Sequence, residues 1–250
     1  MKSLLANTIN ELVKTFSKKK TLALLLLTVL VPLGTAALLL LFKIKLDIRA
    51  VSGGNFPIFI LGLFTNFFLP LFVFMWAADS FAAETGDKTL KLTLTRPISR
   101  IKVFSSKILA IGLVIETFLA VLLFASLAAG IFLGSVQNDW WGSILNSIKA
   151  YLVAGVPMLV IGILGAFIAQ FFRNGSGALT TSIFVYIAAK LLPLVMPQST
   201  NLLLVSYTDW HLLWLGAVPL QQLLYSFSFI LSSAIIFFSA GLYAFISKEL

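Results

Sequence analysis

Six long apolar stretches, each of about 20 residues, dominate this chain. They cover residues 21–42, 56–78, 108–133, 151–172, 178–196 and 223–246. The hydrocarbon core of a bilayer is about 30 Å thick, a distance that an α-helix crosses with about 20 residues. Backbone polar groups inside lipid must be paired within the chain, so such stretches form helices. The sequence therefore predicts an all-α integral membrane protein, with six transmembrane helices in a single transmembrane domain over residues 1–250.

The composition excludes several other classes of protein. Hydrophobic residues make up 60% of the chain and charged residues 11%, and the mean hydropathy is +1.04. The chain has no cysteine and one histidine, which excludes a disulfide framework, a catalytic thiol and a histidine-based metal cluster. We therefore expect no catalytic residues, no metal site and no cofactor held by this chain itself.

The net charge of +9 could suggest a nucleic-acid partner, but its distribution along the chain favours a membrane explanation. Lys and Arg gather in the segments on one side of the predicted spans, as cytoplasmic loops do. Thirteen of them lie on the side of the N-terminus and four on the other: Lys2, Lys14, Lys18, Lys19, Lys20, Lys88, Lys91, Arg96, Arg100, Lys102, Lys107, Arg173 and Lys248 against Lys43, Lys45, Arg49 and Lys149. We expect a multi-pass protein of the cell membrane, with both termini and residues 79–107 in the cytoplasm and no nucleic-acid partner.

Residues 1–17 have the pattern of an amphipathic helix. One face carries Leu4, Leu5, Ile9, Leu12, Val13 and Phe16, and the polar residues Lys2, Asn7, Asn10, Glu11 and Lys14 lie elsewhere. We predict a helix lying in the inner membrane interface, with Asn7 and Lys14 in water. The alternative is a helix packed on a soluble partner.

The last outer loop, 197–222, is rich in aromatic residues that are typical of the headgroup region, namely Tyr207, Trp210 and Trp214. Residues 210–218 are too few to cross a membrane, so we predict a helix lying on or dipping into the outer leaflet. His211 falls in this segment and is interpreted as an interfacial side chain.

The one long polar stretch runs from Asp79 to Lys107. Gly86 could adopt the left-handed conformation that ends a helix, and Pro97 keeps its predecessor out of the α region. These signals predict a short helix over about 87–94, and Ser99 could cap the helix that leads into the third span. The product would be a transverse coupling helix held just outside the membrane.

This stretch also carries a resemblance to a known family. Glu84, then Thr89-Leu90-Lys91-Leu92 with Leu94, and then Thr95-Arg96-Pro97-Ile98-Ser99-Arg100 resemble the type-2 permeases of ATP-binding-cassette (ABC) exporters. The family commonly has glycine directly before Thr-Leu, where this chain has Lys88. The resemblance implies that the loop docks on a separate cytoplasmic ABC ATPase subunit. The implied coupling residues are Glu84, Thr85, Gly86, Asp87, Lys88, Thr89, Leu90 and Leu94.

No ATP site is predicted in this chain itself. Lys88 and Thr89 follow a glycine, but a phosphate-binding loop needs Gly-Lys adjacent and a second glycine where Phe81 stands. The resemblance instead implies that ATP and Mg are held by the partner ATPase. Six spans make half of the usual pathway, so a second permease copy or a sister permease is also expected.

Few polar residues fall inside the predicted spans. Glu116 lies about 12 Å into the bilayer, so its carboxyl should face protein or a cavity. It is either part of the translocation path or a structural carboxyl. Lys190 is expected to extend toward the outer surface, and Asn66 and Gln170 to form hydrogen bonds between helices.

These observations favour the permease subunit of an ABC exporter. The spans are built from Leu, Phe, Ala, Ile and Val, with 23 Phe in the chain, which predicts an amphiphilic substrate, and we favour amphipathic or hydrophobic peptides. Drugs or lipid-like molecules are the alternative within this class. Outside it, the alternatives are a stand-alone secondary transporter and an accessory membrane protein.

Overall fold

A computed structural model describes residues 2–46, 52–86, 99–134, 140–216 and 218–248. The described elements are α1 (Lys2–Phe16), α2 (Lys19–Leu46), α3 (Phe56–Leu63), η1 (Phe64–Phe68), α4 (Leu69–Ala77), η2 (Ala78–Ala83), α5 (Glu84–Gly86), α7 (Arg100–Phe132), α8 (Trp140–Ala169), α9 (Gly175–Val195), η3 (Pro197–Leu202), η4 (Leu204–Trp214) and α10 (Leu220–Ile246). Six helical runs are long and apolar enough to cross a membrane: Lys19–Phe42, Phe56–Gly86, Arg100–Phe132, Trp140–Ala169, Gly175–Val195 and Leu220–Ile246. The predicted fold class and the predicted number of spans are confirmed.

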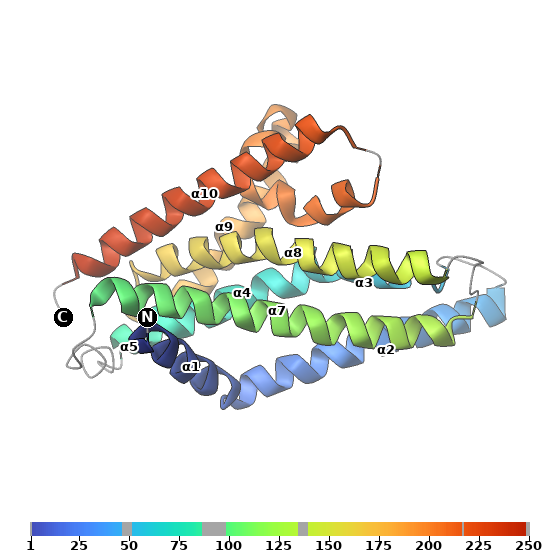
Figure 1. The fold of residues 1–250 in the computed structure, drawn as a ribbon, viewed down its shortest axis with the longest axis horizontal. Helices are drawn as coiled ribbons and strands as arrows, with labels where there is room; N and C mark the ends of the chain where they lie inside the picture. The colour runs from blue at the N-terminus through green and yellow to red at the C-terminus, as the bar shows by residue number, and fades with distance from the viewer. Residues whose placement is uncertain (1, 47–51, 87–98, 135–139, 217, 249–250) are drawn as a thin grey trace.

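Helices α2, α7 and α8 run along the long axis of the molecule, and α9 and α10 are inclined to it (Figure 1). α1, α5, the first turn of α7 and the last turn of α10 lie together, and we call this the terminal end of the bundle. The opposite end, where α2 finishes and α8 begins, is called the loop end. An even number of spans requires this arrangement, because each crossing reverses the direction of the chain.

The second, third and fourth spans form the centre of the bundle. In the most apolar stretch of each of these three spans, 50%, 50% and 61% of the stretch is buried inside the chain. In the first, fifth and sixth spans the buried share is 17%, 17% and 22%. Aromatic rings fill the space between α4 and α7, where the Phe118 ring lies 4.8 Å from Trp76 and 6.0 Å from Phe72. The outer spans therefore leave large apolar surfaces for lipid or for partner helices.

The second span contains two π-helical segments, η1 and η2. Such segments are often found at functional sites in helices. Just after η1, Pro70 lacks the N–H that would bond the carbonyl of Asn66 in a regular helix. The hydroxyl of Tyr186 on α9 donates to that carbonyl instead, at 2.8 Å, so the irregular segment is fixed in place by the fifth span.

The last outer loop differs from the prediction. Its helical part, η4, is a 3₁₀-helix over Leu204–Trp214 rather than a helix over 210–218. η4 packs against α8, α9, α10 and η1, and Trp210 and His211 are 3% and 0% exposed. The expectation that both side chains sit at the headgroups is therefore wrong. Packing between spans buries them, which sequence periodicity cannot foresee for so short a helix.

Burial of His211 predicts that the protein loses stability in acid. Burial lowers the pKa of this histidine below its ordinary value of 6.5, although the charge of Asp209 opposes the shift. A histidine with a lowered folded-state pKa contributes stability above pH 6.5, and that contribution is lost as the pH falls. We expect the free energy of unfolding to fall by about 1.4 kcal/mol for each pH unit below 6.5, until His211 is protonated in the folded state as well.

The check is thermal unfolding of the detergent-solubilised protein between pH 7.5 and 5. His211 is the only histidine in the sequence, so His211→Phe should flatten the stability profile between pH 6.5 and 5. An identical acid loss in the variant would show that other groups cause it.

Candidate functional site

Helix α1 (Lys2–Phe16) lies across the terminal end (Figure 1). Asn7 and Glu11 are 5% and 8% exposed, whereas the apolar side chains of Leu5, Ile9 and Val13 are 58–61% exposed. The amide of Asn7 donates to the hydroxyl of Ser106 on α7. Asn7 is thus not in water as predicted: α7 offers it a polar partner, so this part of the polar face of α1 packs on protein, while Leu5, Ile9 and Val13 point away from the bundle.

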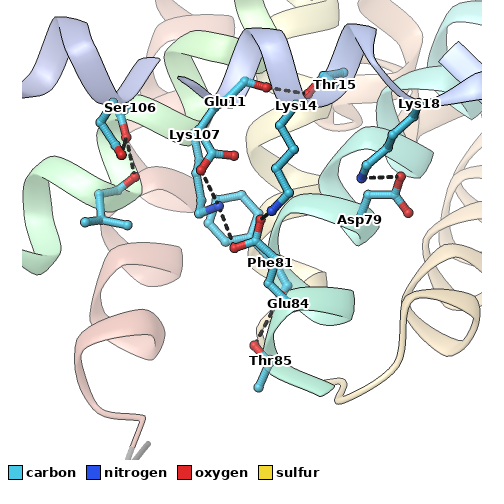
Figure 2. Close-up of polar contacts among 12 residues, drawn as sticks. Glu11, Lys14, Thr15, Lys18, Asp79, Phe81, Glu84, Thr85, Ser106 and Lys107 are labelled. Atoms are coloured by element: carbon cyan, nitrogen blue, oxygen red, sulfur yellow. Dashed lines mark hydrogen bonds and ion pairs between the residues drawn. The ribbon is translucent and has the colours of Figure 1, made fainter. Parts of the chain in front are cut away.

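Four charged side chains from three elements meet beneath α1, and we call Glu11, Lys14, Glu84 and Lys107 the ionic cluster (Figure 2). The ammonium nitrogen Nζ of Lys107 lies 2.8 Å from Oε2 of Glu84 and 3.0 Å from Oε1 of Glu11. The other carboxylate oxygen of Glu84 forms an ion pair with Lys14. One carboxylate therefore joins α1 to α7 through α5.

The charges of the ionic cluster alternate and sum to zero. The Lys107 side chain is 0% exposed and that of Glu84 6%, so both charges have lost nearly all their water. Removing a charge from water costs several kcal/mol, which only close pairing and hydrogen bonding can offset. The ring of Phe81 adds a further contact, with its centroid 5.9 Å from Nζ of Lys107.

Lys14 occupies the exposed edge of the ionic cluster, with 47% of its side chain exposed. Burial alone would lower the pKa of Lys14, but the hydrogen bond and charge of Glu84 outweigh burial and raise it above its ordinary value. A lysine whose pKa is raised by folding stabilises the folded state at all pH values below 10.5. This contribution to stability is lost only as the pH rises through the folded-state pKa. The pair of Lys14 with Glu84 therefore persists at neutral pH.

A second contact joins the turn after α1 to the second span. The ammonium nitrogen Nζ of Lys18 lies 3.1 Å from Oδ2 of Asp79, and the ammonium group of Lys20 forms an ion pair with the same oxygen. Asp79 and Glu84 stand five positions apart across the π-helical segment η2. Since a π-helix bonds residues five apart, this segment helps to turn both carboxylates toward α1 (Figure 2).

Among the implied coupling residues, Glu84, Thr85 and Gly86 lie in α5. Asp87, Lys88, Thr89, Leu90 and Leu94, and with them the predicted coupling helix, lie outside the described residues. Glu84 is buried at the root of this segment, not displayed on the surface. Its contact with an ATPase stays a prediction.

Gly86 is not left-handed as predicted but continues the helix α5. A Cβ atom at this position would lie 2.1 Å from the carbonyl oxygen of Arg173, in the turn between α8 and α9. The glycine therefore permits close approach of two backbones rather than a positive φ.

The third span begins as the sequence predicts. Ser99 is the N-cap of α7, with extended backbone angles, although its side chain makes no capping hydrogen bond. The guanidinium of Arg100 donates to the carbonyls of Ile246 and Lys248 at 2.6 and 3.1 Å. This arginine pairs with carbonyls at the end of α10 that have no partner within the helix. It thereby joins the sixth span to the start of the third span, near the ionic cluster.

Glu116 lies far from the ionic cluster, midway along α7. Its carboxyl rests against the backbone of α8, because a Cβ at Gly155 would come within 1.9 Å of Oε1. Glu116 as a whole residue is exposed on the single chain. A place in the translocation path stays a prediction for this residue.

Two other intramembrane amides behave differently from one another. Asn66 does bridge helices, as predicted, through contacts with Lys190 and Asp209. The side-chain amide of Gln170 donates instead to the backbone carbonyl of Ala166, four residues earlier in the chain. Within the described ranges, no three His, Cys, Asp or Glu side chains gather closely enough to hold a metal ion.

Sequence reasoning missed the ionic cluster itself. Glu11 and Lys14 were assigned to a solvated face and Lys107 to the positive-inside bias, with no partner for any of them. A signal was present, since two acids and two bases all fall at the predicted membrane boundary on one side. Their pairing depends on how α1 folds back across α7, which no local pattern encodes.

The fold and the ionic cluster define a multi-pass helical membrane protein whose N-terminal helix is bound to the ends of its second and third spans. A sequence model of the ABC-2 family transporter proteins matches residues 9–190. The chain therefore belongs to the ABC-2 family of membrane permeases. It is also similar to the uncharacterized membrane protein YdbK of Bacillus subtilis (strain 168), with 27% identity over 193 residues that cover 74% of this chain and 78% of YdbK.

Removing Lys107 should destabilise the protein more than removing any other lysine of the terminal end. Lys107→Met leaves the carboxylates of Glu11 and Glu84 buried without their shared cation, a change that costs about 3–5 kcal/mol. Lys14→Met should cost less than about 1 kcal/mol, because that side chain is half exposed. Denaturant unfolding in detergent measures both.

The exposed Lys102 of α7 provides a matched control, and Lys102→Met should leave stability unchanged. Adding Glu84→Gln to Lys107→Met should recover part of the loss. If Lys107→Met were as stable as the control, the ionic cluster would not hold the terminal end together.

Proposed function

We propose that this chain is the membrane-spanning permease subunit of an ATP-driven ABC exporter. The observation that carries the proposal is the match of an ABC-2 family model to residues 9–190 of a chain with six membrane-crossing helices. The bias of Lys and Arg supports a cell-membrane location with the terminal end in the cytoplasm. A separate ATPase subunit would bind ATP and Mg there, and a second copy or a sister permease would complete the pathway.

The ionic cluster suits the transmission of movement from such an ATPase. Force applied at residues 87–94 would reach α5 first, and α5 is bonded through Glu84 to both α1 and α7. Coupling between distant sites needs packed contacts of this kind rather than a loose loop. In this account the ATPase contacts the coupling segment, while Glu84 passes the displacement on to the first and third spans.

Substitutions beyond Glu84 should separate these two roles. Asp87→Lys with Leu90→Asp should abolish co-purification of the ATPase, because charge and apolar contact are both reversed, while thermal stability of the permease is unchanged. Gln198→Lys with Leu202→Asp, at the exposed loop end, is the matched control. If the ATPase still co-purifies in full amount with the Asp87→Lys, Leu90→Asp variant, this segment is not the docking site.

An amphiphilic peptide is the substrate that we propose for the exporter. The spans expose broad apolar surfaces, among them Phe124, Phe132 and Leu152 at 64–72% exposure, and few charges interrupt them. A hydrophilic ion would lose its hydration along such a wall with nothing to replace it. Glu116, exposed on α7, is proposed to lie on the path, where it could contact a basic group of the peptide.

Reconstituted permease with its ATPase should show ATP hydrolysis that rises several-fold with added amphipathic peptide, because substrate binding favours the transporting conformation. Glu116→Gln should weaken stimulation by cationic peptides more than by neutral ones. Stimulation by drugs or lipid-like molecules alone would replace the peptide assignment. A permease that transports without any ATPase would overturn the exporter proposal.

A further inference from the structure

A cavity of about 440 Å³ opens between the middle of the second span and the fifth span. Its walls are apolar and include Phe67 and Leu71 of the second span and Ile187 and Leu191 of the fifth. Phe67 and Leu191 are 64% and 53% exposed, so the cavity opens on the outer surface of the chain rather than toward the centre of the bundle. Its polar edge is formed by Asn66 and Lys190.

Lys190 is held here by neutral groups. Its ammonium donates to Oδ1 of Asn66 at 2.6 Å and to the hydroxyl of Thr208 at 2.8 Å. The nearby carboxylate of Asp209 accepts from the amide of Asn66 instead, at 2.7 Å. Within the described part of the chain, no carboxylate forms an ion pair with Lys190.

This arrangement leaves a cation in the membrane with an incomplete set of partners. An ammonium group has three N–H donors, and two are used by Asn66 and Thr208. Charged side chains inside a bilayer are costly and usually pair with an opposite charge. Asn66 is itself held by η1 and Tyr186, so the site is fixed in position before any ligand arrives.

We propose that this cavity binds an anionic phospholipid of the outer leaflet. A phosphate oxygen of its head group accepts the third N–H of Lys190, and one acyl chain lies along Phe67, Leu71 and Leu191. Lys190 stands fifteen residues after the start of α9 at Gly175, about 22 Å along the helix, and so lies nearer the end of α9 that leads into η3 than the end that follows α8. The charge of the site selects an anion, and the apolar, outward-facing walls select a lipid over a soluble ion. The assignment does not depend on what the protein transports.

Native mass spectrometry of the purified full-length protein, with phosphatidylglycerol or phosphatidylcholine added, tests the proposal. We expect one tightly held phosphatidylglycerol per chain and roughly fivefold weaker retention of phosphatidylcholine. Lys190→Gln should lower phosphatidylglycerol retention by a similar factor, and Lys190→Arg should restore it. Lys149→Gln, which removes an exposed lysine at the same end, should change nothing.

A second variant keeps the test decisive if Lys190→Gln does not fold. Ile187→Trp fills the cavity from an exposed position, at 50% exposure, and leaves Lys190 intact, so it should also release the lipid. Unchanged retention of phosphatidylglycerol in folded Lys190→Gln or in Ile187→Trp, or equal retention of both lipids, would overturn the proposal. Displacement of phosphatidylglycerol by millimolar inorganic phosphate would assign the site to a free anion instead.

Discussion

The contact between Lys107 and Glu84 is the interaction on which the terminal end depends. A lysine with no exposed side chain is tolerated only because two carboxylates surround it. Those carboxylates come from α1 and α5, so the requirement to neutralise one buried cation fixes the N-terminal helix and the end of the second span against the third. Arg100 extends the same structure to the sixth span through backbone carbonyls.

The cavity between the second and fifth spans meets the same constraint in another way. Lys190 is bonded to an amide and a hydroxyl rather than to a carboxylate, which leaves its charge available to an outside group. Lys107 therefore holds α1, α5 and α7 together, whereas Lys190 borders a cavity. The difference lies in which polar groups the neighbouring helices supply, because in lipid no water is present to satisfy the remainder.

The features that could be predicted from sequence are those with a local physical cause. Apolar length alone indicates six helices, and Ser99 marks the start of α7 because its extended backbone, two residues after Pro97, is set by nearby residues. Pairing of Glu11 with Lys107, and burial of Asn7, depend on how α1 crosses the bundle. The role of Gly86 was misjudged for a similar reason, since the approach of Arg173 to its backbone comes from another turn of the chain.

The central claim is that α1 and the start of α7 form one rigid unit held by the ionic cluster. The chain has no cysteine, so spin labels can be placed uniquely at Val13 and Ile101, which are 61% and 53% exposed. Double electron–electron resonance in lipid nanodiscs then reports the distance between the two helices. The account predicts a single narrow distance distribution that broadens in Lys107→Met, and a broad distribution in the unmodified cluster would contradict it.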